Sequence, residues 1–258
     1  MAKRGAVHPS AVVDARAEID PSAEIGPYAV VGAGVVIGAE TRLASHVVIE
    51  GPTVIGRANT IHSFAVLGGE PQHKRHQGGP ARLVVGDANV FREHVTVHRG
   101  TDGATTSIGS HNLLMVGAHV AHDVVLGSHV TVANGVQLAG HAIVEDYVTF
   151  GGLSGVQQRV RVGESAFVAA GAMVERDVPP FVIMQGDRAR VRALNKVGLG
   201  RRGIDPSAIA ALDAAFRSIF ASKQPRREAA QAICDRLQGA DEDSLVLRLA
   251  RAVLRTPA

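Results

Sequence analysis

Apolar residues, nearly all of them aliphatic, recur at every sixth position along most of the chain. They are Val7, Val13, Ile19, Ile25, Val31, Ile37, Leu43, Ile49, Ile55, Ile61 and Leu67, then Val85, Phe91 and Val97, then Ile108, Leu114, Val120, Leu126, Val132, Leu138, Val144, Phe150, Val156, Val162, Val168 and Val174. An amphipathic helix repeats near 3.6 residues and a half-buried strand every two, so neither ordinary period fits. The pattern predicts a short strand followed by a turn in each unit.

Units of this length predict a solenoid. Stacked coils bury a continuous aliphatic column, and hexapeptide repeats are typical of a parallel β-helix. Gly often follows the aliphatic residue, as in Ile25-Gly26 and Leu126-Gly127, and relieves backbone crowding where the chain bends. The period lapses over "GGEPQHKRHQGGPARL" and again over "HRGTDGATTS". We expect the chemistry where the period breaks or where it carries polar residues.

The period disappears after "RDVPPFVIMQGD", which predicts a β-helix over residues 1–187 and a small helical unit over 188–258. Asp205-Pro206 is a typical helix start, a second helix is expected between Pro225 and Gly239, and a third over 241–255, with acids at its start. The first segment of this unit is rich in basic residues: Arg188, Arg190, Arg192, Lys196, Arg201 and Arg202. They form either a solvated face or a docking surface for an acidic protein or a phosphorylated ligand.

Composition narrows the class of protein. The chain is 46% hydrophobic and 20% charged, which is typical of a globular protein, and 3% aromatic without Trp, so the core must be aliphatic. The single cysteine, Cys234, excludes an internal disulfide. No apolar run resembles a signal segment or a membrane span, so we expect a soluble cytoplasmic protein. A formal net charge of +3 does not imply nucleic-acid binding.

Histidines gather in the stretch "MVGAHVAHDVVLGSHV", where His119 and His122 are three residues apart and Asp123 directly follows His122. His141 lies 18 residues after Asp123, which equals three hexads, so one coil should stack it close to Asp123. For His46, His94, His111 and His129 we favour plain surface or turn roles.

Several polar motifs occur together: "HRG", "NLLMVGAHVAHDVVLG", "LAGHAIVEDY", "GG", "DVPPFVIMQG" and "RRG". With them the whole chain resembles the UDP-N-acetylglucosamine acyltransferases that begin lipid A biosynthesis. The resemblance implies a left-handed parallel β-helix, an exception to the usual right-handed crossover. It also implies a homotrimer with active sites between subunits, and transfer of a 3-hydroxyacyl chain from acyl carrier protein to the 3-hydroxyl of UDP-N-acetylglucosamine, without metal or cofactor.

The resemblance also assigns roles to residues. His122 matches the general base, Asp123 the carboxylate that orients it, and Gly140 the backbone amide that stabilises the oxyanion. Ala170 matches the position that limits acyl length, so its methyl group should shorten the preferred chain. The positions that match substrate-contacting residues are Arg75, His119, His141, Gln157, Gln158, Asn195, Arg201 and Arg202.

Some positions depart from the family pattern, and they leave the acceptor open. His73 and Arg75 stand where the family usually has Asp and Lys, Gln157 replaces a histidine, and Val197 replaces a glutamate. An acceptor with an amine at the sugar 3-position, which would give an N-acyl product, is one alternative. A metal enzyme of the carbonic anhydrase type, with His119 and His122 as ligands, is another. A paralogue that binds without catalysis is the third.

Overall fold

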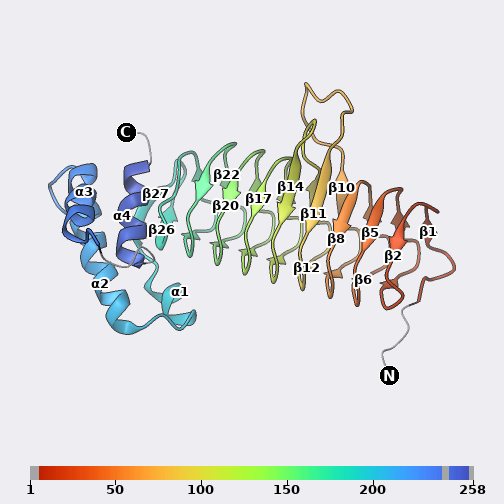
Figure 1. The fold of residues 1–258 in the computed structure, drawn as a ribbon, viewed down its shortest axis with the longest axis horizontal. Helices are drawn as coiled ribbons and strands as arrows, with labels where there is room; N and C mark the ends of the chain where they lie inside the picture. The colour runs from red at the N-terminus through yellow and green to blue at the C-terminus, as the bar shows by residue number, and fades with distance from the viewer. Residues whose placement is uncertain (1–5, 240–243, 256–258) are drawn as a thin grey trace.

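The computed structural model describes residues 6–239 and 244–255, and most of them form a long parallel β-helix (Figure 1). Val12 pairs with Val30 and Val30 with Val48, so an ordinary coil returns to the same place after 18 residues. Each coil contributes one strand to each of three sheets, which form the three faces of a prism. Each six-residue unit therefore forms one of the three faces of a coil.

The three sheets are named A, B and C. Sheet A contains β3 (Glu24–Ile25), β6 (Arg42–Leu43), β9 (Thr60–Ile61), β12 (Val90–Phe91), β15 (Leu113–Leu114), β18 (Thr131–Val132), β21 (Thr149–Phe150), β24 (Phe167–Val168), β26 (Val182–Gln185) and β27 (Arg190–Leu194). Sheet B contains β1 (Val12–Val13), β4 (Val30–Val31), β7 (Val48–Ile49), β10 (Val66–Gly69), β13 (Thr96–His98), β16 (His119–Val120), β19 (Gln137–Leu138), β22 (Gly155–Val156) and β25 (Met173–Val174). Sheet C contains β2 (Glu18–Ile19), β5 (Val35–Ile37), β8 (Thr53–Ile55), β11 (Arg82–Val85), β14 (Thr105–Ile108), β17 (Val125–Leu126), β20 (Ile143–Val144) and β23 (Arg161–Val162).

The interior of the prism is the predicted aliphatic column. Along most of the prism the hexad residue is the inward member of its short strand, as for Leu67, Leu114 and Leu138, which are fully buried. Burial of a Leu, Ile or Val side chain contributes about 1.5–3 kcal/mol, so the repeated column supplies the main driving force for folding. A continuous core of this kind needs no aromatic residues beyond an occasional Phe91 or Phe150.

The corners of the prism require residues with positive φ, and most of these residues are not glycine. Asp123, His129 and His141 have φ near 60°, a region in which Asp and His are tolerated better than bulkier residues. The glycines that follow the inward aliphatic serve a different purpose: a Cβ on Gly26 would lie 2.7 Å from the backbone oxygen of Leu43 in the next coil. The prediction that glycines relieve crowding is confirmed, but the crowding is between coils.

Two insertions interrupt the prism at the same edge, where sheet B meets sheet C. The loop between β10 and β11 projects from the prism in Figure 1, and a shorter loop joins β13 to β14. Val66 pairs with Thr96 and Thr96 with His119, so these two coils exceed the 18-residue repeat while their strands keep register. The lapses in the hydrophobic period are these loops.

A buried asparagine ladder keeps the coils aligned across the insertions. Asn59 Oδ1 accepts hydrogen bonds from the backbone N–H of Asn89 at 2.9 Å and from its Nδ2 at 3.0 Å. Asn89 Oδ1 accepts from the N–H of Asn112 at 2.9 Å, and Asn112 Oδ1 accepts from the N–H of Val130 at 2.7 Å. The three side chains satisfy backbone donors that the interior would otherwise leave unpaired.

The prism ends in an antiparallel hairpin and a group of helices. These are α1 (Lys196–Arg201), α2 (Pro206–Phe216), the π-helical turn η1 (Arg217–Ala221), α3 (Arg226–Arg236) and α4 (Leu245–Arg255). The predicted start at Asp205-Pro206 is confirmed, since Asp205 accepts a hydrogen bond from the N–H of Ser207. The acids at the start of the third predicted helix lie outside the described residues.

The segment 190–194 belongs to sheet A rather than to a helix, because β27 pairs antiparallel with β26. In this segment charged and apolar residues alternate, as in a strand with one exposed face. The domain boundary between residues 187 and 188 stays a prediction. Within the described part of the chain, each helix is too short or too polar to cross a bilayer.

Candidate active site

The histidines of the "AHD" motif lie at the edge between sheets B and C, directly beside both inserted loops. His122 and Asp123 form the corner between β16 and β17, and His141 occupies the same corner one coil later. The backbone N–H of His141 donates to the carbonyl oxygen of His122 at 3.0 Å. The Nε2 atom of His141 lies 3.5 Å from Oδ2 of Asp123. The proximity predicted from the 18-residue spacing is confirmed.

Asp123 holds the imidazole of His122 in one orientation. Nδ1 of His122 lies 2.7 Å from Oδ2 of Asp123, and the two side chains are 5% and 6% exposed. Because a carboxylate only accepts, Nδ1 is the donor of this bond, so that in the neutral imidazole Nε2 carries the lone pair. Thr101, in the second inserted loop, donates to Oδ1 from its N–H and to Oδ2 from its hydroxyl, both at 2.9 Å.

The carboxylate of Asp123 is ionised in this environment. Burial by itself raises the pKa of Asp123, but the hydrogen bonds from His122 and Thr101 outweigh it and lower the pKa below its ordinary value. Thr101 was not identified from the sequence, although it follows the "HRG" motif directly. Its position within a break in the period was the only available signal.

Gly140 leaves room for the ring of His122. A Cβ on Gly140 would lie 2.6 Å from Cε1 and 2.8 Å from Nε2 of that ring, closer than carbon atoms pack. The N–H of Gly140 donates to no acceptor among the described residues, whereas its carbonyl accepts from the N–H of Arg159 at 3.1 Å. A free backbone donor therefore lies beside the imidazole.

The first inserted loop and the strands β13 and β16 bring further histidines to this corner. His73, from the first loop, packs edge-on against His122 with ring centroids 5.1 Å apart, and His141 also packs edge-on against His122, at 5.2 Å. His98 packs against His119 at 5.3 Å, and Nδ1 of His119 lies 2.8 Å from the hydroxyl oxygen of Thr96. His98 was not named as a site residue, although it begins "HRG".

Burial lowers the pKa of two of these histidines, His119 and His141. Burial, together with the neighbouring His98 and His122, lowers the pKa of His119 to about 4. Burial also lowers the pKa of His141, since the opposing effect of Asp123 is smaller and Arg159, His122 and His73 add to the decrease.

A cavity of about 460 Å³ lies over the outer face of sheet B at this corner. Its lining residues are Gln72, His119, Ala121, His122, Gln137, Leu138, Ala139, Gly140, Gly155, Val156, Gln157, Gln158, Met173, Val174 and Glu175. The cavity thus brings together five residues singled out in the sequence, namely His119, His122, Gly140, Gln157 and Gln158. Arg75 is exposed on the first loop and does not line it.

The other predicted site residues lie elsewhere in this chain. Asn195, Arg201 and Arg202 line a second cavity of about 430 Å³ at the edge between sheets C and A. Asn195 is already committed to the fold, since its Oδ1 accepts from the N–H of Gly198 at 3.0 Å and its Nδ2 donates to the carbonyl of Ser165 at 2.8 Å. Ala170 is exposed at the third edge, between sheets A and B.

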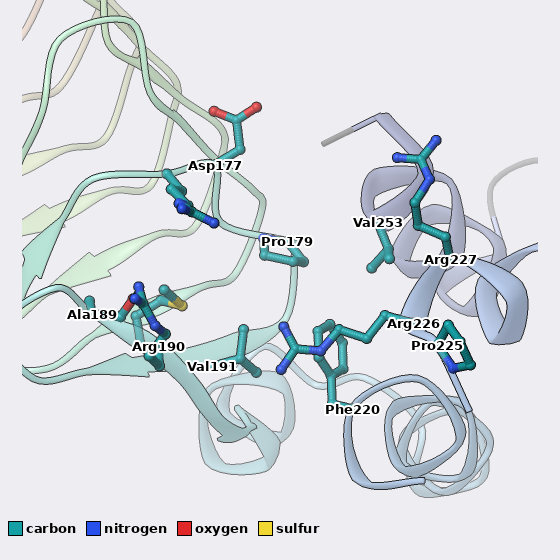
Figure 2. A pocket seen from close by; sticks show the side chains of 12 residues that line it. Asp177, Pro179, Ala189, Arg190, Val191, Phe220, Pro225, Arg226, Arg227 and Val253 are labelled. Atoms are coloured by element: carbon teal, nitrogen blue, oxygen red, sulfur yellow. The ribbon is translucent and has the colours of Figure 1, made fainter. Parts of the chain in front are cut away.

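A third cavity, of about 480 Å³, lies between the end of the prism and the helices (Figure 2). It is lined by Arg176, Asp177, Pro179, Met184, Ala189, Arg190, Val191, Phe220, Pro225, Arg226, Arg227 and Val253. Figure 2 shows Arg226 extending over Phe220, with its guanidinium carbon 5.2 Å from the ring centroid. The residues that line it include no histidine, in contrast to the cavity at the histidine corner.

His122, Asp123 and His141 are also close enough to hold a metal ion, because one ligand atom of each lies within 4.8 Å of the others. This set differs from the pair His119 and His122 that the metal alternative named. The Oδ2 atom of Asp123 is already hydrogen-bonded to His122, so a metal ion would have to displace that bond.

Known proteins match this chain over nearly its whole length. The model of domain 2 of UDP-N-acetylglucosamine O-acyltransferases matches residues 177–255, and the model of the bacterial transferase hexapeptide matches residues 105–140. An acyl-(acyl-carrier-protein)-UDP-N-acetylglucosamine O-acyltransferase of Halorhodospira halophila is 44% identical over 243 residues, which cover 93% of this chain and 94% of that protein. The enzyme of the same name from Synechocystis is 46% identical over 184 residues, 71% of this chain and 67% of that one.

Solved structures give the same result. The UDP-N-acetylglucosamine acyltransferase of Francisella novicida superposes with a TM-score of 0.92 at 34% identity, over 97% of this chain and 92% of that one. The O-acyltransferase of Moraxella catarrhalis superposes with a TM-score of 0.91 at 39% identity, over 97% of each chain. The fold and the histidine corner therefore define a hexapeptide-repeat acyltransferase with a left-handed parallel β-helix. The chain belongs to the family of acyl-(acyl-carrier-protein)-UDP-N-acetylglucosamine O-acyltransferases.

Proposed function

We propose that this protein transfers a 3-hydroxyacyl chain from acyl carrier protein to the 3-hydroxyl of UDP-N-acetylglucosamine, with His122 as general base. The observation that carries the proposal is the 2.7 Å hydrogen bond between His122 and Asp123 beside an open cavity. The family supplies the classes of donor and acceptor. We place the reaction in the cytoplasm, at the first step of lipid A biosynthesis.

The chemistry needs one base that later acts as an acid. Nε2 of His122 removes the proton of the sugar hydroxyl while the hydroxyl oxygen attacks the thioester carbonyl carbon. Asp123 accepts from Nδ1 and stabilises the imidazolium that forms. When the carbon–sulfur bond breaks, Nε2 returns the proton to sulfur. The products are the sugar ester and the thiol of the carrier protein, and the enzyme forms no covalent intermediate.

The N–H of Gly140 is the proposed donor to the thioester oxygen. Negative charge develops on this oxygen as the sugar attacks, and a fixed backbone donor stabilises it without reorganisation. Gly140 lies against the His122 ring and has no competing acceptor within the described residues. His122 and the N–H of Gly140 are thus both placed beside the same reacting thioester carbonyl.

The complete site requires two copies of the chain. The histidine cavity lies over sheet B, whereas the cavity with Asn195, Arg201 and Arg202 lies over sheet A at a different edge. Contacts between two different surfaces close into a ring when the rotation permits. The proposed homotrimer places the histidines of one subunit opposite the arginines of its neighbour. These arginines bind the nucleotide and the acidic carrier protein. His119, His141, Gln157 and Gln158 contact the sugar or the acyl chain, and Arg75 of the first loop contacts the sugar nucleotide.

The reaction is tested with purified protein, UDP-N-acetylglucosamine and a series of acyl carrier thioesters, with mass spectrometry of the product. We expect an O-acyl product, lost by at least about 10³-fold in His122→Ala, as for removal of a catalytic base. His46→Ala is the matched control, because His46 is exposed and stacks with Tyr28 at another edge. Acylation of only the 3-amino analogue would identify the N-acyl alternative, and stoichiometric metal would identify the metal alternative. Normal folding without acyl transfer would identify a binding paralogue.

The shared site is tested by subunit mixing. His122→Ala and Arg202→Ala should each be inactive as pure trimers, while co-expressed mixtures should regain part of the activity, because some interfaces then combine two intact halves. Light scattering should give the mass of three chains. Mixtures that stay inactive would contradict a site built from two subunits.

A further inference from the structure

Glu164 is a buried carboxylate that receives two arginines from the C-terminal segment. Its residue is 7% exposed and follows β23 at the edge between sheets C and A. Oε1 accepts from Nη1 of Arg202 at 2.7 Å, and Oε2 pairs with Arg248 of α4. A carboxylate at this depth is stable only if it is paired, so the two arginines and Glu164 depend on one another.

Arg202 is held on two further sides. Its guanidinium carbon lies 3.7 Å from the centroid of the Tyr147 ring, and Nη1 also donates to the hydroxyl of Ser165. His129 stacks on Tyr147 with centroids 4.7 Å apart, and Ser165 takes the next corner position one coil later. Because serine is small, the guanidinium can continue the ring stack where another aromatic side chain would have blocked it.

This arrangement leaves part of the guanidinium facing the second cavity. The side chain of Arg202 is 21% exposed, and it lines that cavity with Tyr147, Ser165 and Asn195. Glu164 contacts only Nη1. The guanidinium carries N–H donors besides those of Nη1, and its exposed part lines the cavity, where a planar set of donors fits a phosphate.

We infer that Glu164 is a positioning residue for the nucleotide: together with Tyr147 and Ser165 it fixes Arg202 in the orientation that binds the diphosphate of the acceptor. The inference rests on the proposed function, which assigns Arg202 to the nucleotide. Glu164 itself does not touch the substrate. Its second partner, Arg248, stacks over Phe181 at 5.5 Å from the ring centroid and attaches α4 to the prism.

The two partners allow positioning to be separated from folding. Glu164→Gln keeps the size of the side chain but removes its charge, so the orientation of Arg202 is lost. We expect the KM for UDP-N-acetylglucosamine to rise roughly tenfold, the size of one charge-assisted hydrogen bond. The value of kcat should stay within about twofold, because neither the base nor the oxyanion donor changes.

Arg248→Gln is the matched control, since it removes the other ion pair of Glu164. It should lower the melting temperature and leave the KM for the nucleotide sugar unchanged. Equal increases of KM in Glu164→Gln and Arg248→Gln would mean that Glu164 only anchors the helices, and would overturn the proposal. If Glu164→Gln does not fold, Ser165→Ala removes one contact of Arg202 and should raise the same KM; an unchanged KM then overturns it.

Calorimetric titration with UDP-N-acetylglucosamine separates this inference from the proposed reaction. A wild-type protein that binds the nucleotide sugar but transfers no acyl chain would contradict the reaction alone. In that case the positioning role would still be detected, because Glu164→Gln should bind the nucleotide sugar with a roughly tenfold higher Kd than the wild type. Equal Kd values in the two proteins, or no binding to the wild type, would contradict the positioning role.

Discussion

Nδ1 of His122 lies 2.7 Å from Oδ2 of Asp123 at a corner where the backbone of Asp123 has a φ of 62°. The two residues are adjacent in the chain, so the hydrogen bond between them is a local contact. Long-range contacts then complete it, since Thr101 from the second inserted loop donates twice to the same carboxylate. The hexapeptide repeat thus contains His122 and Asp123, and the inserted loop adds the hydrogen bonds that hold the Asp123 carboxylate.

Asp123→Asn should reduce kcat by about 10²–10⁴, because an amide can donate to Nδ1 and so favour the tautomer that lacks a free Nε2 lone pair. The fold should survive, since the amide oxygen still accepts from Thr101. Steady-state kinetics alongside circular dichroism would check this. An unchanged kcat would show that Asp123 does not orient the base.

Gly140→Ala should lower kcat by at least about 10², because its Cβ would displace the His122 ring from beside the backbone amide. Gly200→Ala is the matched control, since a Cβ there meets nothing within 4 Å and the position is helical. Activity close to that of the wild type in Gly140→Ala would contradict the described placement of the ring.

Stability should fall as the pH is lowered from about 6.5 to about 4, through His119. The pKa of His119 is lowered to about 4 in the folded protein, so within this window the unfolded chain binds a proton that the folded one does not. The free energy of unfolding therefore increases with pH there and levels off above the ordinary histidine pKa. Urea unfolding at pH 7 and pH 5 would measure it, and His119→Gln should show a smaller difference between the two values.

Asn89→Ala should destabilise the protein by about 3 kcal/mol, because it leaves the buried N–H of Asn112 without its acceptor and removes the hydrogen bonds that Nδ2 of Asn89 donates to Oδ1 of Asn59 and to the carbonyl of Gly109. The urea midpoint measures this loss. Asn134→Ala is the control, since Asn134 is exposed, and it should change stability by less than about 0.5 kcal/mol. Equal midpoints would mean that the ladder does not hold the coils in register.

Ala170→Gly should shift the preference toward longer acyl chains, because it removes a methyl group from the proposed limit of the acyl site. Ala170 is exposed at the edge between sheets A and B, across sheet B from the His122 corner. Competition between acyl carrier thioesters of different length would measure the ratio of kcat/KM values. No change in that ratio would contradict the assignment of Ala170 to acyl length.

The hydrophobic period by itself determined the β-helix, the inward-facing residues and the two loops that interrupt them. It also predicted that His141 stacks near Asp123, because contacts between coils depend only on a fixed spacing of 18 residues. The family resemblance named His122, Gly140, Gln157 and Gln158, and all four line one cavity. A repeating fold converts sequence spacing directly into distance, which is why these expectations could be made.

Only the tertiary structure decided the contacts that do not follow the repeat. His73 and Thr101 reach the dyad from loops whose lengths are not set by the period, and β27 joins sheet A through a hairpin. Arg202 lies at a different edge from His122, and its partner Glu164 is 38 residues away along the chain. Such contacts depend on how loops and helices pack against the prism, and no local pattern of hydrophobic and polar residues contains that information.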